Sequence, residues 1–229
     1  MLLIRLRQIV DLVRPTARAM SWHPPVWAAV LALGYVLKEA PSAYIEYRIL
    51  VLRVAALLLC IASAFVLDDA TEETIGHVPT PLLMRRGLRI ALLLPLVAST
   101  WIGVVNVAGD VAVRDGGPMP AGDLTLEAAT LLAIALCASC VGARLASDRV
   151  GGIAAAPIVL GLVAVALFLP PDQKMILGSP SDPRWADAHE WWRAALVSAA
   201  VVFLWVNRSP GSYRAVARRR ALKSAPRTL

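Results

Sequence analysis

The densest group of ionisable side chains lies in residues 66–89, VLDDATEETIGHVPTPLLMRRGLR, between two long apolar runs. Within this segment Glu73 and His77 are four residues apart, so they can share one helix face and form half of a metal site. The other two histidines, His23 and His189, are far away in the sequence. No ligand set is therefore complete, and we predict no metal site.

Motifs that would make the chain an enzyme or a nucleotide-binding protein are missing. The sequence has no H-E-x-x-H, no G-x-S-x-G and no phosphate loop of the form G-x-x-x-x-G-K-[ST]. Cys137 and Cys140 form a single C-x-x-C inside an apolar run, without a second pair. We therefore predict no catalytic residue and no cofactor on this chain.

The composition indicates an integral membrane protein. Hydrophobic residues make up 58% of the 229 positions and charged residues 17%, and the mean hydropathy is +0.65. A spanning helix needs about 20 mostly apolar residues. Six such runs occur, which predicts an all-α protein with six transmembrane helices, at Trp22–Leu37, Ile49–Leu67, Leu88–Ala108, Leu124–Ala143, Val150–Leu169 and Trp191–Val206.

The first residues predict an amphipathic helix rather than a cleaved signal peptide. Apolar residues between Leu2 and Val13 fall on one helical face and polar residues between Arg5 and Arg14 on the other, until Pro15, where we expect the helix to end. Such a helix suits the headgroup plane of a bilayer. We divide the chain into this interfacial helix (1–20), a membrane domain (21–208) and a basic tail (209–229).

The distribution of charge predicts the orientation. Most of the 23 Lys and Arg residues flank the spans on one side if the N-terminus is in the cytoplasm, and most loop carboxylates are then on the other. We therefore expect a multi-pass protein of the bacterial cytoplasmic membrane with both termini in the cytoplasm. The basic tail would contact anionic lipid headgroups, and we expect no nucleic acid.

In this orientation the acidic segment, residues 68–87, is cytoplasmic. Asp69 and Glu72 have the spacing of a helix N-terminal box, which predicts a short helix from about Ala70 to Gly76. A plain connection needs only a few polar residues. We interpret the segment as a docking element for a cytoplasmic partner; the alternative is a solvated loop whose acids balance nearby arginines.

On the other side of the membrane, residues 170–190 form the longest loop. Ser181 to Arg193 opens with Ser-Asp-Pro, which predicts a short helix that leads into the last span. Two polar residues inside the spans, Arg53 and Asn106, are candidates for a substrate path. For Arg53, snorkelling toward the nearby membrane surface is the favoured alternative.

Together these features resemble the membrane subunit of ABC-2-type transporters. The local sequence LDDATEETIGHVPTPLLMRR also looks like the segment between the second and third spans of small actinobacterial permeases of that family. The resemblance implies that this segment is a coupling helix that binds a nucleotide-binding ATPase subunit. Its contacts would be Asp69, Glu72, Glu73, Thr74 and His77.

The same resemblance implies a second permease copy or paralogue, with ATP and Mg on the partner ATPase and none on this chain. The substrate would be hydrophobic or amphiphilic. Two other functions stay open: a non-transporting assembly or regulatory subunit of a larger complex, and a lipid-modifying membrane enzyme. The enzyme would need Arg53, Asn106 or the pair of Glu73 and His77, which our topology places on different sides of the bilayer.

Overall fold

The computed structural model describes residues 2–42, 44–68, 82–114, 118–145, 151–168 and 178–208, and this part of the chain contains helices and short connections but no strand. The α-helices are α1 (Leu2–Ala19), α2 (His23–Glu39), α3 (Ile45–Ala64), α4 (Leu82–Arg114), α5 (Ala121–Leu145), α6 (Gly151–Phe168) and α7 (Trp185–Arg208). Two short 3₁₀ segments, η1 (Ala40–Ser42) and η2 (Phe65–Leu67), follow α2 and α3. The predicted all-α fold is confirmed for these residues.

Four of the described helices are long and apolar enough to cross a membrane: Ile45–Leu67, Leu83–Arg114, Ala121–Arg144 and Gly151–Phe168. The first and last predicted spans lie in α2 and α7, which are outside this set. α2 has 17 residues, about 25 Å of helix, whereas a bilayer core is about 30 Å thick. α7 carries Asp187, Glu190 and Arg193 near its start. Six spans therefore stay a prediction.

The N-terminal helix forms, but Pro15 does not end it. Pro15 lies inside α1, which continues to Ala19. A proline removes only one main-chain hydrogen bond and can be kept within a helix at a bend. After α1, the indole Nε1 of Trp22 donates to the carbonyl of Ala17 at 2.6 Å, and two prolines occupy the start of α2, where their missing N–H groups cost nothing.

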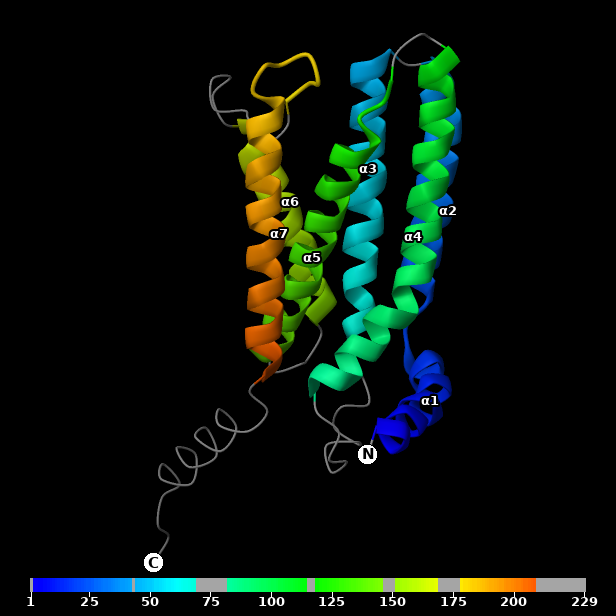
Figure 1. The fold of residues 1–229 in the computed structure, drawn as a ribbon, viewed down its shortest axis with the longest axis vertical. Helices are drawn as coiled ribbons and strands as arrows, with labels where there is room; N and C mark the ends of the chain where they lie inside the picture. Colours follow the sequence, from blue (N-terminus) through cyan, green and yellow to red (C-terminus); the bar gives the residue numbers. More distant parts are fainter. Residues whose placement is uncertain are drawn as a thin grey trace, which may run out of the picture.

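The helices lie side by side, with α1 and the C-terminal end of α7 at the same end of the bundle (Figure 1). α5 is central, because it packs on α3, α6 and α7, while α2 packs on α3 and α4. α4 changes direction in its first half (Figure 1) and contains Pro95, a usual cause of a kink. This end of α4 contacts η2, and α4 also contacts α7.

Glycines let α5 and α6 approach closely. A Cβ atom on Gly151 would lie 2.2 Å from the carbonyl oxygen of Ser139, and one on Gly142 would lie 2.5 Å from the Cβ of Ala154. Small residues at such contacts are a common feature of helix packing in membranes. Gly151 therefore serves the packing of α6 on α5 within the chain.

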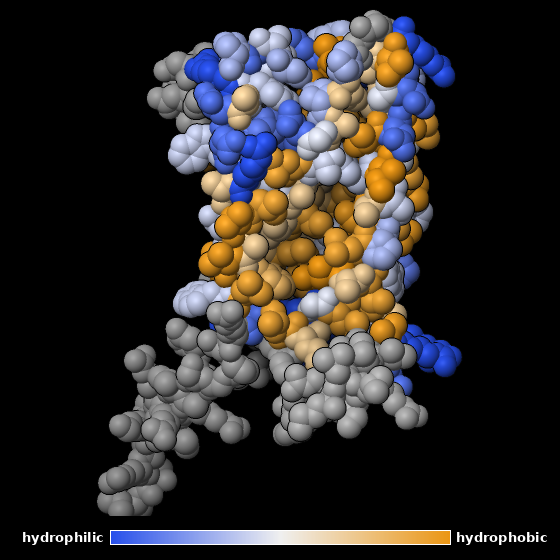
Figure 2. Space-filling view, viewed as in Figure 1, coloured by the Kyte–Doolittle hydropathy of each residue, from blue (hydrophilic) through white to orange (hydrophobic). Residues whose placement is uncertain are grey.

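An apolar belt crosses the middle of the face drawn in Figure 2. Figure 2 shows hydrophobic residues across the centre of one face, with a hollow among them, and hydrophilic residues toward the upper end. Large apolar side chains are exposed on several helices, among them Trp27, Ile102, Ile153, Val165, Val197 and Trp205. A soluble monomer seldom exposes so much contiguous apolar surface, so this belt supports a bilayer as the surrounding medium.

Candidate functional site

The predicted docking residues Asp69, Glu72, Glu73, Thr74 and His77 lie outside the described residues. The two predicted path residues are described, and the structure does not bring them together. Asn106 is exposed on α4, whereas Arg53 lies on α3 beside a cavity of about 250 Å³ that Asn106 does not line. The structure instead places Arg53 in a set of buried polar residues on α3, α5 and α7.

Arg53 and Glu127 form a bidentate ion pair between α3 and α5. Nε of Arg53 donates to Oε2 of Glu127 at 2.7 Å, and Nη2 donates to Oε1 at 2.8 Å. The side chains are only 13% and 3% exposed. A planar guanidinium matches a carboxylate in this geometry. Arg53 therefore does not snorkel to the surface, as we had favoured; its charge is compensated inside the bundle.

His189 on α7 approaches the same carboxylate. Its Nε2 atom lies 3.3 Å from Oε1 of Glu127, and its side chain is 3% exposed. These two atoms do not have hydrogen-bonding geometry, so Nε2 is a buried polar atom with no hydrogen-bond partner among the described residues. The other ring nitrogen, Nδ1, is 2.8 Å from the carbonyl oxygen of Trp185. Three helices thus meet at Glu127.

Trp185 packs against this group of residues. Its indole Nε1 donates to Oδ2 of Asp123 at 2.7 Å. Its ring lies 4.4 Å from the His189 ring and 5.8 Å from Cζ of Arg53, within the range of cation–π attraction. We call Arg53, Asp123, Glu127, Trp185 and His189 the Arg53 cluster.

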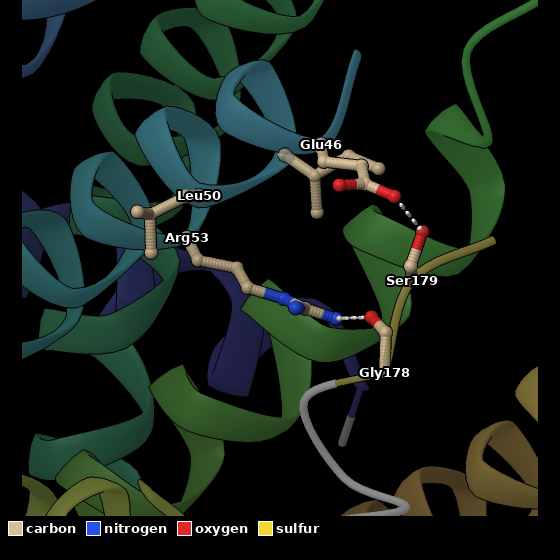
Figure 3. A pocket seen from close by; sticks show the side chains of 6 residues that line it. Glu46, Leu50, Arg53, Gly178 and Ser179 are labelled. Carbon is tan, nitrogen blue, oxygen red and sulfur yellow. Dashed lines mark hydrogen bonds between the residues drawn. The ribbon is translucent and has the colours of Figure 1, made fainter. Parts of the chain in front are cut away.

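The segment before α7 is fastened to α3 beside this cluster. Figure 3 shows Arg53 pointing toward Gly178, whose carbonyl accepts from Nη2 at 3.3 Å. Ser179 donates to Glu46 at 3.2 Å, and both residues line the cavity (Figure 3). Asp182 accepts from the main-chain N–H of Arg184 at 2.9 Å, and this hydrogen bond holds the pKa of Asp182 below its usual value. The predicted external helix is the first part of α7 itself.

At the other end of the bundle, Asp68 caps α6. Its Oδ1 atom accepts from the main-chain N–H of Gly152 at 2.6 Å, which satisfies one of the free donors at a helix start. Burial raises the pKa of Asp68, although the N–H groups of Gly152 and Gly151 and the charge of Arg89 oppose this rise. Asp68 therefore contacts a helix that begins far along the chain, whereas the short helix predicted from about Ala70 to Gly76 lies outside the described residues.

Two arginines of α4 extend this arrangement. Arg89 donates to the carbonyl of Asp68 at 2.9 Å and to that of Val66 at 3.4 Å. Arg86 donates to Oδ1 of Asn207 on α7 at 2.8 Å. Both arginines are buried. We call Asp68, Arg86, Arg89 and Asn207, with the start of α6, the Asp68 network.

Neither region supplies a metal site, because in the described ranges no three His, Cys, Asp or Glu residues are placed so that they could hold a metal ion. Cys60, Cys137 and Cys140 are free thiols buried among the helices. Cys137 contacts the carbonyl of Ala199 at 2.9 Å, and Asn207 Nδ2 lies 3.8 Å from Sγ of Cys140. The two thiols of α5 thus fill contacts with α7, whereas Cys60 on α3 contacts the carbonyl of Ala128 on α5 at 3.6 Å.

Sequence reasoning missed Glu127, Asp123 and the role of His189. The signal was present, because Glu127 is a carboxylate inside a predicted span, and such residues are functional candidates by default. Arg53 and Glu127 also lie similarly far from the starts of α3 and α5, so their opposite charges could have been paired.

The chain matches no protein-family model, no curated protein and no solved structure.

Proposed function

We propose that this chain is the membrane-spanning permease subunit of an ATP-driven transporter, coupled to a separate ATPase through the segment between α3 and α4. One observation carries the proposal: both ends of that segment join the Asp68 network. Asp68 precedes it and caps α6, and Arg86 and Arg89 follow it on the first turns of α4.

This arrangement suits a coupling element, because a partner that pulled on the segment would move several helices at once. Arg89 bonds the end of η2, after α3, at Val66 and Asp68. Arg86 bonds α7 at Asn207. The described residues that flank the segment therefore connect it to α3, α4, α6 and α7 through short polar contacts.

The proposal includes six spans, which requires α2 and α7 to cross the bilayer besides the four helices of spanning character. Exposed apolar side chains on both helices support this, among them Trp27 and Leu31 on α2 and Val197 and Val201 on α7. An even number of spans agrees with α1 and the end of α7 lying at one end (Figure 1). The positive-inside rule would make that end cytoplasmic.

A functional unit would pair this chain with a second copy or a paralogue and with an ATPase that binds ATP and Mg. The membrane would be the cytoplasmic membrane of a bacterium. The apolar belt of Figure 2, with its hollow, suits a hydrophobic or amphiphilic substrate that is exported from within the bilayer. Exposed apolar surface on α4 and α6, such as Ile102 and Ile153, gives lipid or a second permease an area to contact.

The test begins with the tagged full chain, purified in detergent from its native membranes. We expect a protein with a phosphate-loop motif to copurify, identified by mass spectrometry. After reconstitution in liposomes, the double variant Glu72→Lys/Glu73→Lys should reduce the permease-stimulated ATPase rate by tenfold or more. Charge reversal at a docking surface builds repulsion into the contact, which costs several kcal/mol in protein interfaces.

The matched control is Asp187→Lys/Glu190→Lys, because both carboxylates are exposed on α7, far from the end at which α1 lies (Figure 1). It makes the same change of charge and should leave ATPase stimulation within twofold of wild type. Equal stimulation by wild type and the Glu72→Lys/Glu73→Lys variant would rule out the docking segment. A purified complex that holds other membrane proteins and no ATPase would favour the assembly subunit instead.

A further inference from the structure

We propose that the cavity between the start of α3 and the segment before α7 binds the ammonium group of an alkylamine or of an amine-bearing lipid. The proposal does not rest on the transporter function, because no step of it involves an ATPase or the movement of a substrate. The cavity lies at the end of the bundle opposite α1 (Figure 1). Its lining consists of Glu46, Ile49, Leu50, Arg53, Gly178 and Ser179.

The first step is the size of the cavity. A cavity needs about 10–15 Å³ to hold one water molecule, so a volume of about 250 Å³ has room for a small organic group. Pockets for drug-sized ligands measure about 300–1,000 Å³. The cavity therefore suits a small molecule, or one group of a larger molecule whose remainder stays outside.

The second step is the charge of the lining. Glu46 and Arg53 are the two ionisable residues that line the cavity. The charge of Arg53 is matched by Glu127, which accepts from Nε at 2.7 Å and from Nη2 at 2.8 Å. Glu46 is exposed, and its hydrogen bond within the described ranges comes from the neutral hydroxyl of Ser179. An ionised Glu46 therefore leaves one uncompensated negative charge beside the cavity.

The third step is the set of hydrogen-bond acceptors. Oε1 of Glu46 accepts from Ser179 at 3.2 Å, so the second carboxylate oxygen can accept from a ligand. The carbonyl of Gly178 accepts one long hydrogen bond from Arg53, at 3.3 Å, and a carbonyl oxygen has two lone pairs. Figure 3 shows Glu46 pointing toward Ser179, the neighbour of Gly178. An ammonium group has three donors and no acceptor, which matches these oxygens.

The fourth step is the apolar part of the lining. Ile49 is buried, whereas Leu50 is 50% exposed, so an alkyl chain could continue from the cavity along Leu50. A metal ion fits less well, because Ca²⁺ takes about six to eight oxygen ligands. The described residues contain no group of three His, Cys, Asp or Glu that could hold a metal ion. The composition therefore favours an alkylammonium group.

Glu46 also has two structural roles, which the test must separate from binding. It lies in the first turn of α3, where a carboxylate stabilises the helix start. Its hydrogen bond with Ser179 fastens the segment before α7 to α3. Neither role requires a ligand, so the test measures the affinity for a ligand and not the stability of the protein.

The direct test is isothermal titration calorimetry of the purified full chain in a nonionic detergent at pH 7.0, with hexylammonium as the probe. We expect saturable binding. Hexanol, which has the same chain and no charge, should bind at least tenfold more weakly, and hexanoate should not bind. In Glu46→Gln the affinity for hexylammonium should fall about tenfold, as expected for the loss of a hydrogen bond to a charged group.

Two variants provide matched controls. Ser179→Ala removes the fastening contact and keeps the charge of Glu46, whereas Glu46→Gln keeps an oxygen that can accept from Ser179. The affinity of Ser179→Ala should therefore stay within threefold of wild type. Asp187→Asn removes an exposed carboxylate of α7 that does not line the cavity, and it should bind hexylammonium within twofold of wild type.

A second probe, dihexanoylphosphatidylethanolamine, distinguishes the two sources of the ammonium group. Tighter binding of this lipid than of hexylammonium, weakened in Glu46→Gln, would assign the site to a lipid headgroup; the reverse order would assign it to a free amine. The proposal would be overturned if neither probe bound saturably, or if hexanol bound as tightly as hexylammonium. Equal affinities of wild type and Glu46→Gln, or equal losses in Glu46→Gln and Ser179→Ala, would also overturn it.

Discussion

The Arg53 cluster and the Asp68 network are two solutions to one problem, the burial of polar groups in an apolar helical bundle. In the cluster, an arginine binds a carboxylate through two hydrogen bonds, and both groups are charged. In the network, the arginines of α4 donate to neutral acceptors, namely the Asn207 amide and the carbonyls of Val66 and Asp68.

The difference teaches how each region responds to change. The cluster depends on a balance of charge, so the loss of one partner leaves an uncompensated ion in a buried place. The network depends on local geometry: a cap at the start of α6, a kinked α4 and close backbone contacts. We therefore expect the cluster to be most sensitive to the removal of charge, and the network to be most sensitive to added volume or a lost cap.

The largest effect should come from Glu127→Leu. This substitution leaves Arg53 buried without its carboxylate, and the loss of one partner of a buried ion pair costs about 3–5 kcal/mol. We expect the unfolding free energy in detergent to fall by that amount, measured by denaturant titration with tryptophan fluorescence.

The double variant Arg53→Leu/Glu127→Leu is the control that separates charge from shape. Removal of both charges avoids the unpaired ion, so its stability should return to within about 1 kcal/mol of wild type. A double variant as unstable as Glu127→Leu alone would mean that the shape of the two side chains, and not their charge, stabilises the contact.

The next effect concerns the close contact of α5 and α6. In Gly151→Ala the new methyl group would lie 2.2 Å from the carbonyl oxygen of Ser139, which forces the two backbones apart. Overpacking of this kind costs about 1–3 kcal/mol. Thermal unfolding in the same detergent provides the measurement.

Gly161→Ala is the matched control on the same helix, because nothing lies within 4 Å of a Cβ atom there. It should be as stable as wild type or slightly more stable, since alanine favours the helix. Equal losses at Gly151 and Gly161 would show that helix propensity, and not the contact with α5, determines the result.

The sequence predicted the helices well, because apolar runs of about 20 residues are a strong signal. All six predicted runs overlap described helices. It predicted less well how far each helix extends. Pro15 was expected to end α1, but the helix continues to Ala19. The loss of one main-chain hydrogen bond at the proline was not enough to end it.

The partners of polar residues could be predicted only in part, because they depend on which helices pack together. Arg53 was recognised as a cation inside a span, but its partner Glu127 is 74 residues away. Asp68 caps α6 through the N–H of Gly152, 84 residues further on. Partners this far apart in the sequence do not belong to one helix, so helical periodicity cannot reveal them. Only the tertiary structure shows which residues pair.

A smaller effect is expected at the cap of α6. Asp68→Ala removes the acceptor for the N–H of Gly152, and the loss of such a cap costs about 1 kcal/mol. Asp68→Asn keeps a side-chain oxygen that caps equally well, so it should be close to wild type at neutral pH. Equal stability of all three proteins would show that the cap contributes nothing measurable.

The smallest effect is the pH dependence at the same residue, where the network does contain a titratable charge. Burial raises the pKa of Asp68 above its unfolded value. A raised carboxyl pKa means that the folded state binds the proton more tightly, so this contribution to stability is complete below the unfolded pKa and is lost as the pH rises through the folded pKa. Wild type should therefore lose stability relative to Asp68→Asn between about pH 4 and neutral pH, by less than the effect of Asp68→Ala. Denaturant titrations of both proteins at several pH values give the difference directly.

A difference that grows in favour of wild type with rising pH would mean that the N–H groups at the start of α6 and Arg89 outweigh burial. The Asp68 network would then depend on charge as the Arg53 cluster does.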